Sequence, residues 1–174
     1  HTPGDSADVL VAMNPAALKT NLQYLKKGGI IICDVDSFTP ANLKKALYQT
    51  EDPVTELGID PQKIMLVPMT TLLKNTLADS GMDTKAIMKC KNMLALGLVC
   101  WLFDRPVDKV LSKLKAKFAK KPAIYEANEK VIRAGWDYGH NTHASMSTYR
   151  IETEAAIPGT YTDINGNTAT AWGL

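Results

Sequence analysis

The first stretch of the chain that carries candidate chemistry is the turn at Asn14. Asn14 follows the apolar run VLVAM and precedes Pro15. An asparagine here is suited to cap a following helix, and the free N–H groups at a helix N-terminus attract anions such as phosphate. The turn contains no glycine, so it lacks the G-x-G-x-x-G pattern of a dinucleotide site. Asn14 is therefore a candidate phosphate contact, and its simpler role is to cap its own helix.

A second candidate is the pair Lys91 and Asn92, which begins the stretch KNMLALGLVCW. Lys91 has the charge to hold a phosphate or a carboxylate, and Asn92 can hydrogen-bond the backbone of a neighbouring element. The plainer interpretation is the polar face of a helix beside its buried stripe. Gly97 within this helix costs about 1 kcal/mol relative to alanine. We expect it to permit the close approach of another backbone, which is a packing role.

Other polar groups fit catalysis or metal binding less well. His140 and His143 lie three residues apart beside Asp137, a spacing that metal sites use, but we expect a loop there with no further ligand nearby. Ser145 and Ser147 complete the composition of a catalytic triad without any G-x-S-x-G pattern. We therefore expect neither a metal site nor a catalytic residue in this chain.

A lysine-rich helix is expected within residues 107–121, with Val110, Leu111, Leu114 and Phe118 as its apolar stripe. Such a helix can bind an acidic partner or a nucleotide tail, although a solvated face is the simpler interpretation because carboxylates elsewhere balance the charge. The whole chain carries a net charge of only +2. It gives no reason to expect nucleic acid or an anionic membrane as a partner. The lysines are Lys109, Lys113, Lys115, Lys117, Lys120 and Lys121.

The composition is that of a folded globular domain, with 45% hydrophobic and 22% charged residues. Cys33, Cys90 and Cys100 form no C-x-x-C pair, which predicts reduced, buried thiols in a cytoplasmic protein and argues against a local zinc or iron–sulfur site. The longest apolar run, residues 93–103, is shorter than the ~20 residues that span a bilayer, so we expect a buried helix.

The elements that must position these residues are alternating strands and helices in the first part of the chain and helices alone afterwards. Short apolar runs predict strands that are covered on both faces, and the first strand, helix and strand form a βαβ unit. The fold class predicted is α/β, with three layers, a mainly parallel sheet flanked by helices, and a helical C-terminal half. The strands are expected at residues 8–13, 30–33 and 63–69, and the helices at 15–27 (ended by Gly28 and Gly29), 39–48, 70–81, 83–103, 107–121 and 122–135 (ended by Gly135), with a polar loop at 51–61.

Several stretches together resemble one family. They are DVLVAMNPAALKTNLQYLKKGGIIICD, VPMTTL, CKNMLALGLVCWLFDRP and FAKKPAIYEANEKVIRAGWDYG. In this order they resemble the gamma domain of the 2-oxoacid:ferredoxin oxidoreductases, in particular that of the alpha subunit of 2-oxoglutarate:acceptor oxidoreductases (2-oxoglutarate synthases). The tail GTYTDINGNTATAWGL is similar to the entry into the pyrimidine-binding domain that follows in that subunit.

The resemblance implies a domain organisation. Residues 1–140 would be a gamma-type α/β domain that lacks its N-terminal part, including a first glycine-containing βα unit. Residues 141–160 would be a linker, and residues 161–174 the start of the pyrimidine-binding domain. The family's YPITP-type segment, which binds the 2-oxoacid, would lie beyond residue 174.

The resemblance also implies an activity and a division of labour. The complete enzyme would convert 2-oxoglutarate and coenzyme A to succinyl-CoA and pass electrons to ferredoxin. Thiamine diphosphate, Mg and iron–sulfur clusters would act in the full complex, with none bound within this chain alone. The partners would be the beta subunit, ferredoxin-type subunits and coenzyme A. This chain would be structural or would contact coenzyme A through Asn14, Lys91 and Asn92; a non-catalytic nucleotide- or CoA-binding module and a pure assembly module remain the alternatives.

Overall fold

A three-stranded parallel sheet is the centre of the described structure. The computed structural model of the chain describes residues 6–142, 149–150, 157–160 and 164–173. The strands follow one another across the sheet in chain order, and both neighbouring pairs are parallel. They are β1 (Ala7–Ala12), β2 (Leu25–Asp34) and β3 (Ile64–Val67). The parallel sheet expected from the alternation of apolar runs and helices is therefore confirmed.

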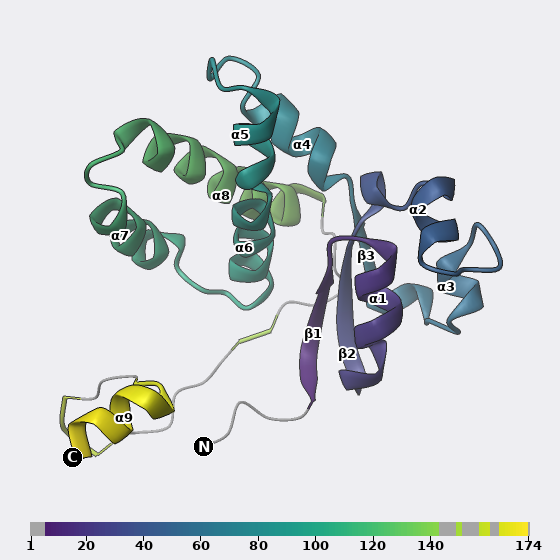
Figure 1. Cartoon of the computed structure of the whole chain (residues 1–174), viewed down its shortest axis with the longest axis horizontal. Helices are drawn as coiled ribbons and strands as arrows, with labels where there is room; N and C mark the ends of the chain where they lie inside the picture. The colour runs from purple at the N-terminus through teal and green to yellow at the C-terminus, as the bar shows by residue number, and fades with distance from the viewer. Residues whose placement is uncertain (1–5, 143–148, 151–156, 161–163, 174) are drawn as a thin grey trace.

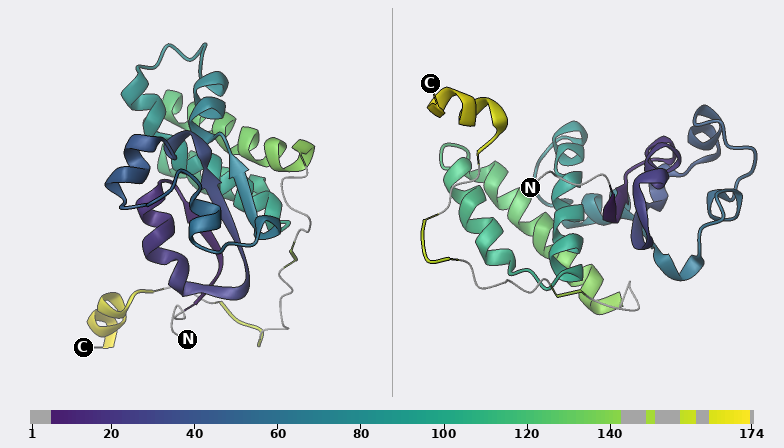
Figure 2. Two further views of the ribbon diagram at one scale, coloured as in Figure 1. Left: turned by 90° about the vertical axis from the view of Figure 1, so that its right-hand side faces the viewer. Right: turned by 90° about the horizontal axis from the view of Figure 1, so that it is seen from below.

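Helices lie against both faces of this sheet (Figures 1 and 2). On one face, Leu18 of helix α1 (Pro15–Asn21) packs in one cluster with Ile31 and Cys33 of β2. The opposite face, which includes Ile32 and Val67, packs against the helices of the C-terminal half. These are chiefly α4 (Met69–Thr76), α6 (Lys91–Leu102) and α8 (Pro122–Thr142). The predicted α/β fold with a helical C-terminal half is confirmed.

Side-chain caps set the starts of several short helices. The Thr39 hydroxyl accepts a hydrogen bond from the Asn42 N–H at the start of α2, and Asp83 accepts one from Ala86 at the start of α5. Asp52 caps a short helix within residues 51–61, and Asp60 caps a second that begins at Pro61, so the prediction of a plain loop there was incomplete. The remaining bounds are η1 (Leu22–Tyr24), η2 (Val35–Ser37), α2 (Pro40–Lys45), α3 (Pro53–Glu56), η3 (Pro61–Lys63), α5 (Thr84–Lys89), α7 (Val107–Lys117) and α9 (Gly166–Gly173).

The first helix is shorter than predicted, and β2 begins earlier. The sequence predicts a helix up to Gly28 and Gly29, but α1 ends at Asn21 and both glycines lie within β2. The pairing of β1 with β2 is irregular here, and a Cβ at Gly29 would lie 2.9 Å from the carbonyl oxygen of Asp8. Gly29 is therefore needed for a bulge between two strands, and the prediction that it ends a helix was wrong.

The long helix predicted over residues 83–103 is two helices. Cys90 ends α5 and begins α6, with φ −83° and ψ −5°. Its backbone N–H donates to the carbonyls of Ile87 and Met88, which is the bonding of a tight turn and interrupts the α-helical ladder. Because of this break, α6 is a separate helix whose first residue, Lys91, reaches Asp34 at the end of β2.

Helix α8 continues past Gly135, contrary to the prediction that this glycine ends it. Gly135 lies where α8 crosses α6: a Cβ there would clash with the carbonyl oxygen of Leu94 and lie 3.2 Å from the Leu98 nitrogen. In the same way, a Cβ at Gly97 would clash with the Ile132 carbonyl oxygen and lie 2.9 Å from the Trp136 nitrogen. The prediction that Gly97 permits close backbone approach is confirmed, and Gly135 is its partner in the crossing.

Near the C-terminus, helix α9 begins at Gly166, with the Asn165 side chain accepting a hydrogen bond of 2.9 Å from the Thr168 N–H. Most of the predicted linker, residues 141–160, lies outside the described residues. Among the helices that the structure describes, none is both long enough and apolar enough to cross a bilayer.

The glycine crossing gives a test of the fold. Replacing Gly135 with alanine should lower the free energy of unfolding by about 1–3 kcal/mol, the usual cost of overpacking. The added methyl would clash with backbone atoms of α6, which cannot move away as a flexible side chain can. Gly28→Ala is the matched control, since a Cβ there has no neighbour within 4 Å. Urea denaturation followed by tryptophan fluorescence measures both. Equal stability of the two variants would contradict the crossing.

Candidate functional site

The polar centre of the described structure is a buried carboxylate at the C-terminal end of β2. The Asp34 side chain is completely buried, and it forms an ion pair with Lys91 of α6. It also accepts hydrogen bonds from the Ser37 hydroxyl at 2.6 Å and from the Thr70 hydroxyl at 3.2 Å. We call these four residues the Asp34 cluster. They come from the end of β2, from η2, and from the starts of α4 and α6, so the cluster joins four elements.

Further bonds fix the start of α4 to the same edge of the sheet. The Met69 N–H donates to the other carboxylate oxygen of Asp34 at 3.0 Å, and the Thr71 N–H donates to Asp36 at 2.7 Å. These N–H groups lie in the first turn of α4, where a helix has no internal acceptors and where negative charge is favoured. Asp34, at the end of β2, and Asp36, in η2, thus cap the first turn of α4.

The electrostatics of the cluster favour the ionised form of Asp34. Burial alone would raise the pKa of this carboxyl. The hydrogen bonds from Lys91, Ser37 and Thr70, together with the positive charge of Lys91, outweigh burial and hold the pKa of Asp34 below its ordinary value. Lys91 also donates to the Ser37 hydroxyl at 3.1 Å. The amine of Lys91 is therefore engaged by groups of its own chain.

Asn14 lies at the end of β1 and caps α1, as the sequence predicts. Its side-chain oxygen accepts a hydrogen bond of 2.8 Å from the Ala17 N–H. A small pocket of about 200 Å³ lies beside this turn, and Asn42 and Lys45 of α2 contribute to its lining. This volume is below the 300–1,000 Å³ that is usual for whole small-molecule sites, so the pocket suits a small group such as a single phosphate.

The structure does not bring the three predicted contact residues together. Asn14 follows β1 and Lys91 begins α6 beside the end of β2, but Lys91 does not line the pocket at Asn14. Asn92 is exposed on the first turn of α6. The sequence predicts that Lys91 holds a phosphate or a carboxylate. In the structure Lys91 binds a carboxylate, and that carboxylate is Asp34 of the same chain.

Sequence reasoning missed Asp34, Asp36, Ser37 and Thr70 as members of this site. A signal was present: two acidic residues follow directly on the buried strand IIIC, and polar residues at the ends of parallel strands meet at one edge of a sheet. The sequence carried no information on which cation, if any, would reach a carboxylate so far away along the chain.

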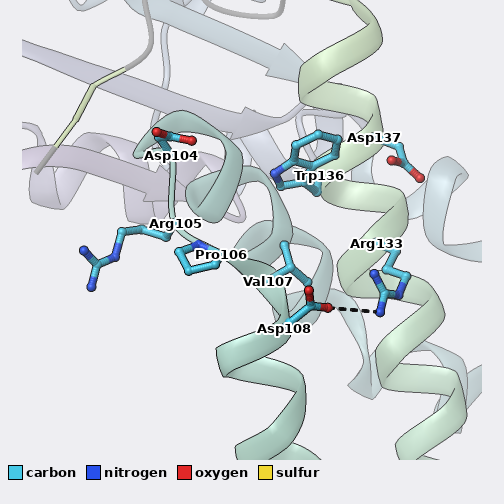
Figure 3. A pocket seen from close by; sticks show the side chains of 8 residues that line it. All are labelled: Asp104, Arg105, Pro106, Val107, Asp108, Arg133, Trp136 and Asp137. Carbon is cyan, nitrogen blue, oxygen red and sulfur yellow. Dashed lines mark hydrogen bonds and ion pairs between the residues drawn. The ribbon is translucent and has the colours of Figure 1, made fainter.

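A pocket of about 400 Å³ lies away from the strand ends, between the turn that follows α6 and helix α8 (Figure 3). Figure 3 shows Trp136 on the same side of the pocket as Asp137, and Arg133 pointing toward Asp108. The Arg133 guanidinium nitrogen lies 3.4 Å from the Asp108 carboxylate oxygen. The pocket is lined by two arginines and three aspartates, so its charge is mixed and does not favour a cationic or an anionic ligand. The arrangement holds no nucleophile paired with a base, so it offers no catalytic constellation.

The histidine segment differs from its prediction. Asp137 and His140 lie within α8, where a loop was expected, and the His140 ring stacks on Trp136 with centroids 4.9 Å apart. His143, Ser145 and Ser147 lie outside the described residues. Within the described ranges, no group of three or more His, Cys, Asp or Glu side chains is placed to hold a metal ion.

The three cysteines are free and buried, as predicted. Burial, and to a lesser degree the charge of Asp34, raises the pKa of Cys33 to about 12. Burial also raises the pKa values of Cys90 and Cys100. These thiols are therefore poor nucleophiles, because the thiolate is the reactive form.

This fold belongs to a known class of proteins. The model of the pyruvate ferredoxin/flavodoxin oxidoreductase family matches residues 1–138. The chain therefore belongs to this family, which confirms the family resemblance seen in the sequence. No solved structure matches the chain.

A curated relative is a Mycobacterium tuberculosis (strain ATCC 25618 / H37Rv) protein named 2-oxoglutarate oxidoreductase subunit KorA. It is 43% identical over 173 residues, which are 99% of this chain and 26% of the relative. The chain thus spans about a quarter of the length of the relative that it matches.

The buried ion pair gives a quantitative prediction. Lys91→Met should lower the free energy of unfolding by about 3–5 kcal/mol, because it leaves the Asp34 carboxylate buried without its counter-charge. The double variant Asp34→Asn/Lys91→Met should lose less than Lys91→Met, since no charge then remains buried. The control is Lys26→Met, which removes an exposed ion pair with Asp8 and should cost at most about 1 kcal/mol.

The same pair predicts a pH dependence. Because the folded pKa of Asp34 is lowered, its contribution to stability is complete above the pKa of an unfolded aspartate, about 4, and is lost as the pH falls through the folded value. Urea titrations of wild type and Asp34→Asn between neutral and acid pH measure this. An identical acid dependence of both proteins would show that Asp34 is not the group that titrates.

Proposed function

We propose that this chain is part of a thiamine-dependent 2-oxoacid:ferredoxin oxidoreductase that oxidatively decarboxylates 2-oxoglutarate with coenzyme A to succinyl-CoA. The observation that carries the proposal is the 43% identity, over nearly the whole chain, to a protein named 2-oxoglutarate oxidoreductase subunit KorA. Family membership supports the reaction class, and the relative's name supports the choice of 2-oxoacid. The chain acts as a gamma-type domain of the alpha subunit.

Within such an enzyme, we assign this chain a supporting role. Its only fully buried carboxylate among the described residues is tied to Lys91, Ser37, Thr70 and the Met69 N–H, so the groups that neutralise and hydrogen-bond it all belong to this chain. Its thiols are buried and separate. We therefore propose that thiamine diphosphate, Mg and the iron–sulfur clusters are held by other parts of the complex, including the beta subunit and ferredoxin-type subunits, in the cytoplasm.

A contact with coenzyme A is proposed at the Asn14 turn. The pocket there combines the Asn14 cap, Asn42 and the Lys45 side chain, which suits one phosphate group of the coenzyme. Lys91 is the weaker candidate because its amine already has two partners in the chain, and Asn92 lies next to it on α6. A non-catalytic nucleotide- or CoA-binding module and an assembly module are the competing functions, and the two experiments below separate them.

The coenzyme contact is tested by calorimetry with coenzyme A on the full-length protein. Lys45→Met should weaken binding by about tenfold, as expected for the loss of one charge-assisted hydrogen bond to a phosphate. Lys44→Met is the matched control, since Lys44 does not line the pocket. Asn14→Ser keeps a capping oxygen and should retain the stability of α1. A third variant, Asn14→Ala, removes the side-chain oxygen altogether. If the affinity for coenzyme A is unchanged in both Lys45→Met and Asn14→Ala, the pocket does not bind the coenzyme and Asn14 only caps α1.

The activity is tested by reconstitution. The full-length protein, combined with its thiamine-binding partner subunit, should reduce ferredoxin when given 2-oxoglutarate and coenzyme A, and should form succinyl-CoA in step with the reduction. Residues 1–174 alone should give no turnover. Turnover with pyruvate but not with 2-oxoglutarate would refute the substrate, and turnover by residues 1–174 alone would refute the supporting role.

A further inference from the structure

Helix α7 presents an apolar stripe that the rest of the described chain covers only in part. Of its aliphatic residues, Leu111 is buried, whereas Val110 and Leu114 are only partly buried. These two side chains line a shallow groove of about 520 Å³, together with Pro106. An amphipathic helix normally turns such a stripe into the core. Here part of the stripe remains available to another molecule.

The rim of this groove is basic. Lys109, Lys113 and Lys117 stand at intervals of four residues along one side of α7, and Arg105 continues the row before the helix. Like charges at this spacing repel one another and weaken the helix that carries them. The row therefore works against the stability of α7 on its own, and an external anionic partner would relieve the repulsion.

The basic charge is concentrated on α7 and the residues that flank it. Residues 105–121 contain seven basic side chains and one acidic side chain, although the whole chain has a net charge of only +2. The acidic residue, Asp108, pairs with Arg133 of α8 at 3.4 Å. Within the described ranges, no lysine of α7 lies within ion-pair distance of a carboxylate. The positive potential of the row is thus directed at solvent.

We propose that the α7 groove, formed by Arg105, Pro106, Lys109, Val110, Lys113, Leu114 and Lys117, is a docking surface for an acidic amphipathic helix of a partner protein. The aliphatic floor receives aliphatic side chains, and the basic rim pairs with carboxylates. Acidic residues at intervals of four along a partner helix repeat about every 6 Å, which equals the repeat of the α7 lysines. A nucleic acid would place phosphates over Val110 and Leu114, so the aliphatic floor favours a protein.

The proposal is tested by fluorescence anisotropy on the full-length protein. The probe is a synthetic helical peptide with leucines on one stripe and glutamates at intervals of four beside it. The triple variant K109E/K113E/K117E should weaken its binding at least about tenfold. The matched control, K74E/K85E/K89E, makes the same change in net charge at exposed lysines of α4 and α5 and should stay within about twofold. Circular dichroism verifies that both variants fold.

The floor of the groove has its own test. Val110→Thr keeps the size of the side chain and replaces one methyl with a hydroxyl, so it should weaken peptide binding without changing the dependence on salt concentration. A peptide of the same composition in scrambled order should bind at least about tenfold more weakly. If both triple variants lose the same affinity for the peptide, or if the scrambled peptide binds as tightly as the original, binding depends on net charge alone and the proposal is overturned. Tighter binding of oligo-dT or of phosphatidylserine vesicles than of the peptide would also overturn it.

Discussion

The ion pair between Asp34 and Lys91 is the interaction on which the described fold most depends. A carboxylate with no exposure to solvent is costly unless it is paired and hydrogen-bonded, and Asp34 has both forms of compensation. Asp34 ends β2 and its partners lie on η2, α4 and α6, so the same bonds that satisfy the charge also join the sheet to the helical half. The position of α6, and through it that of α8, follows from this single polar centre.

A second constraint acts within the helical half. Gly97 and Gly135 face one another's helix backbones, so α6 and α8 pack more closely than side chains would allow. Each glycine weakens its own helix relative to alanine. Contact between the two helices compensates for this, and Trp101 uses the same device where its ring lies against Gly139. The two helices therefore form one unit, which the Asp34 cluster attaches to the sheet.

Much of this architecture was predictable from local patterns. The strands that end at Ala12 and Val67 are apolar runs with polar ends, and the role of Gly97 followed from its cost in an apolar helix. Gly135 and Gly29 were misjudged because a glycine that ends a helix and one that admits a neighbouring backbone look the same in the sequence. The partner of Lys91 was not predictable, because spacing along the chain does not say which distant carboxylate a lysine will meet. Candidate contacts at Asn14 and Asn92 remain predictions for the same reason.

The separation of these partners along the chain has a consequence for synthesis on the ribosome. Asp34 needs the N–H of Met69, 35 residues later, and Ser37 is bonded by Lys91, 54 residues later. At the usual rate of translation the lysine emerges roughly 3–10 s after the serine. Throughout that interval the nascent sheet carries an acidic group that has no cation to neutralise it. We therefore expect the C-terminal end of β2 to gain its final order only when α6 has left the exit tunnel.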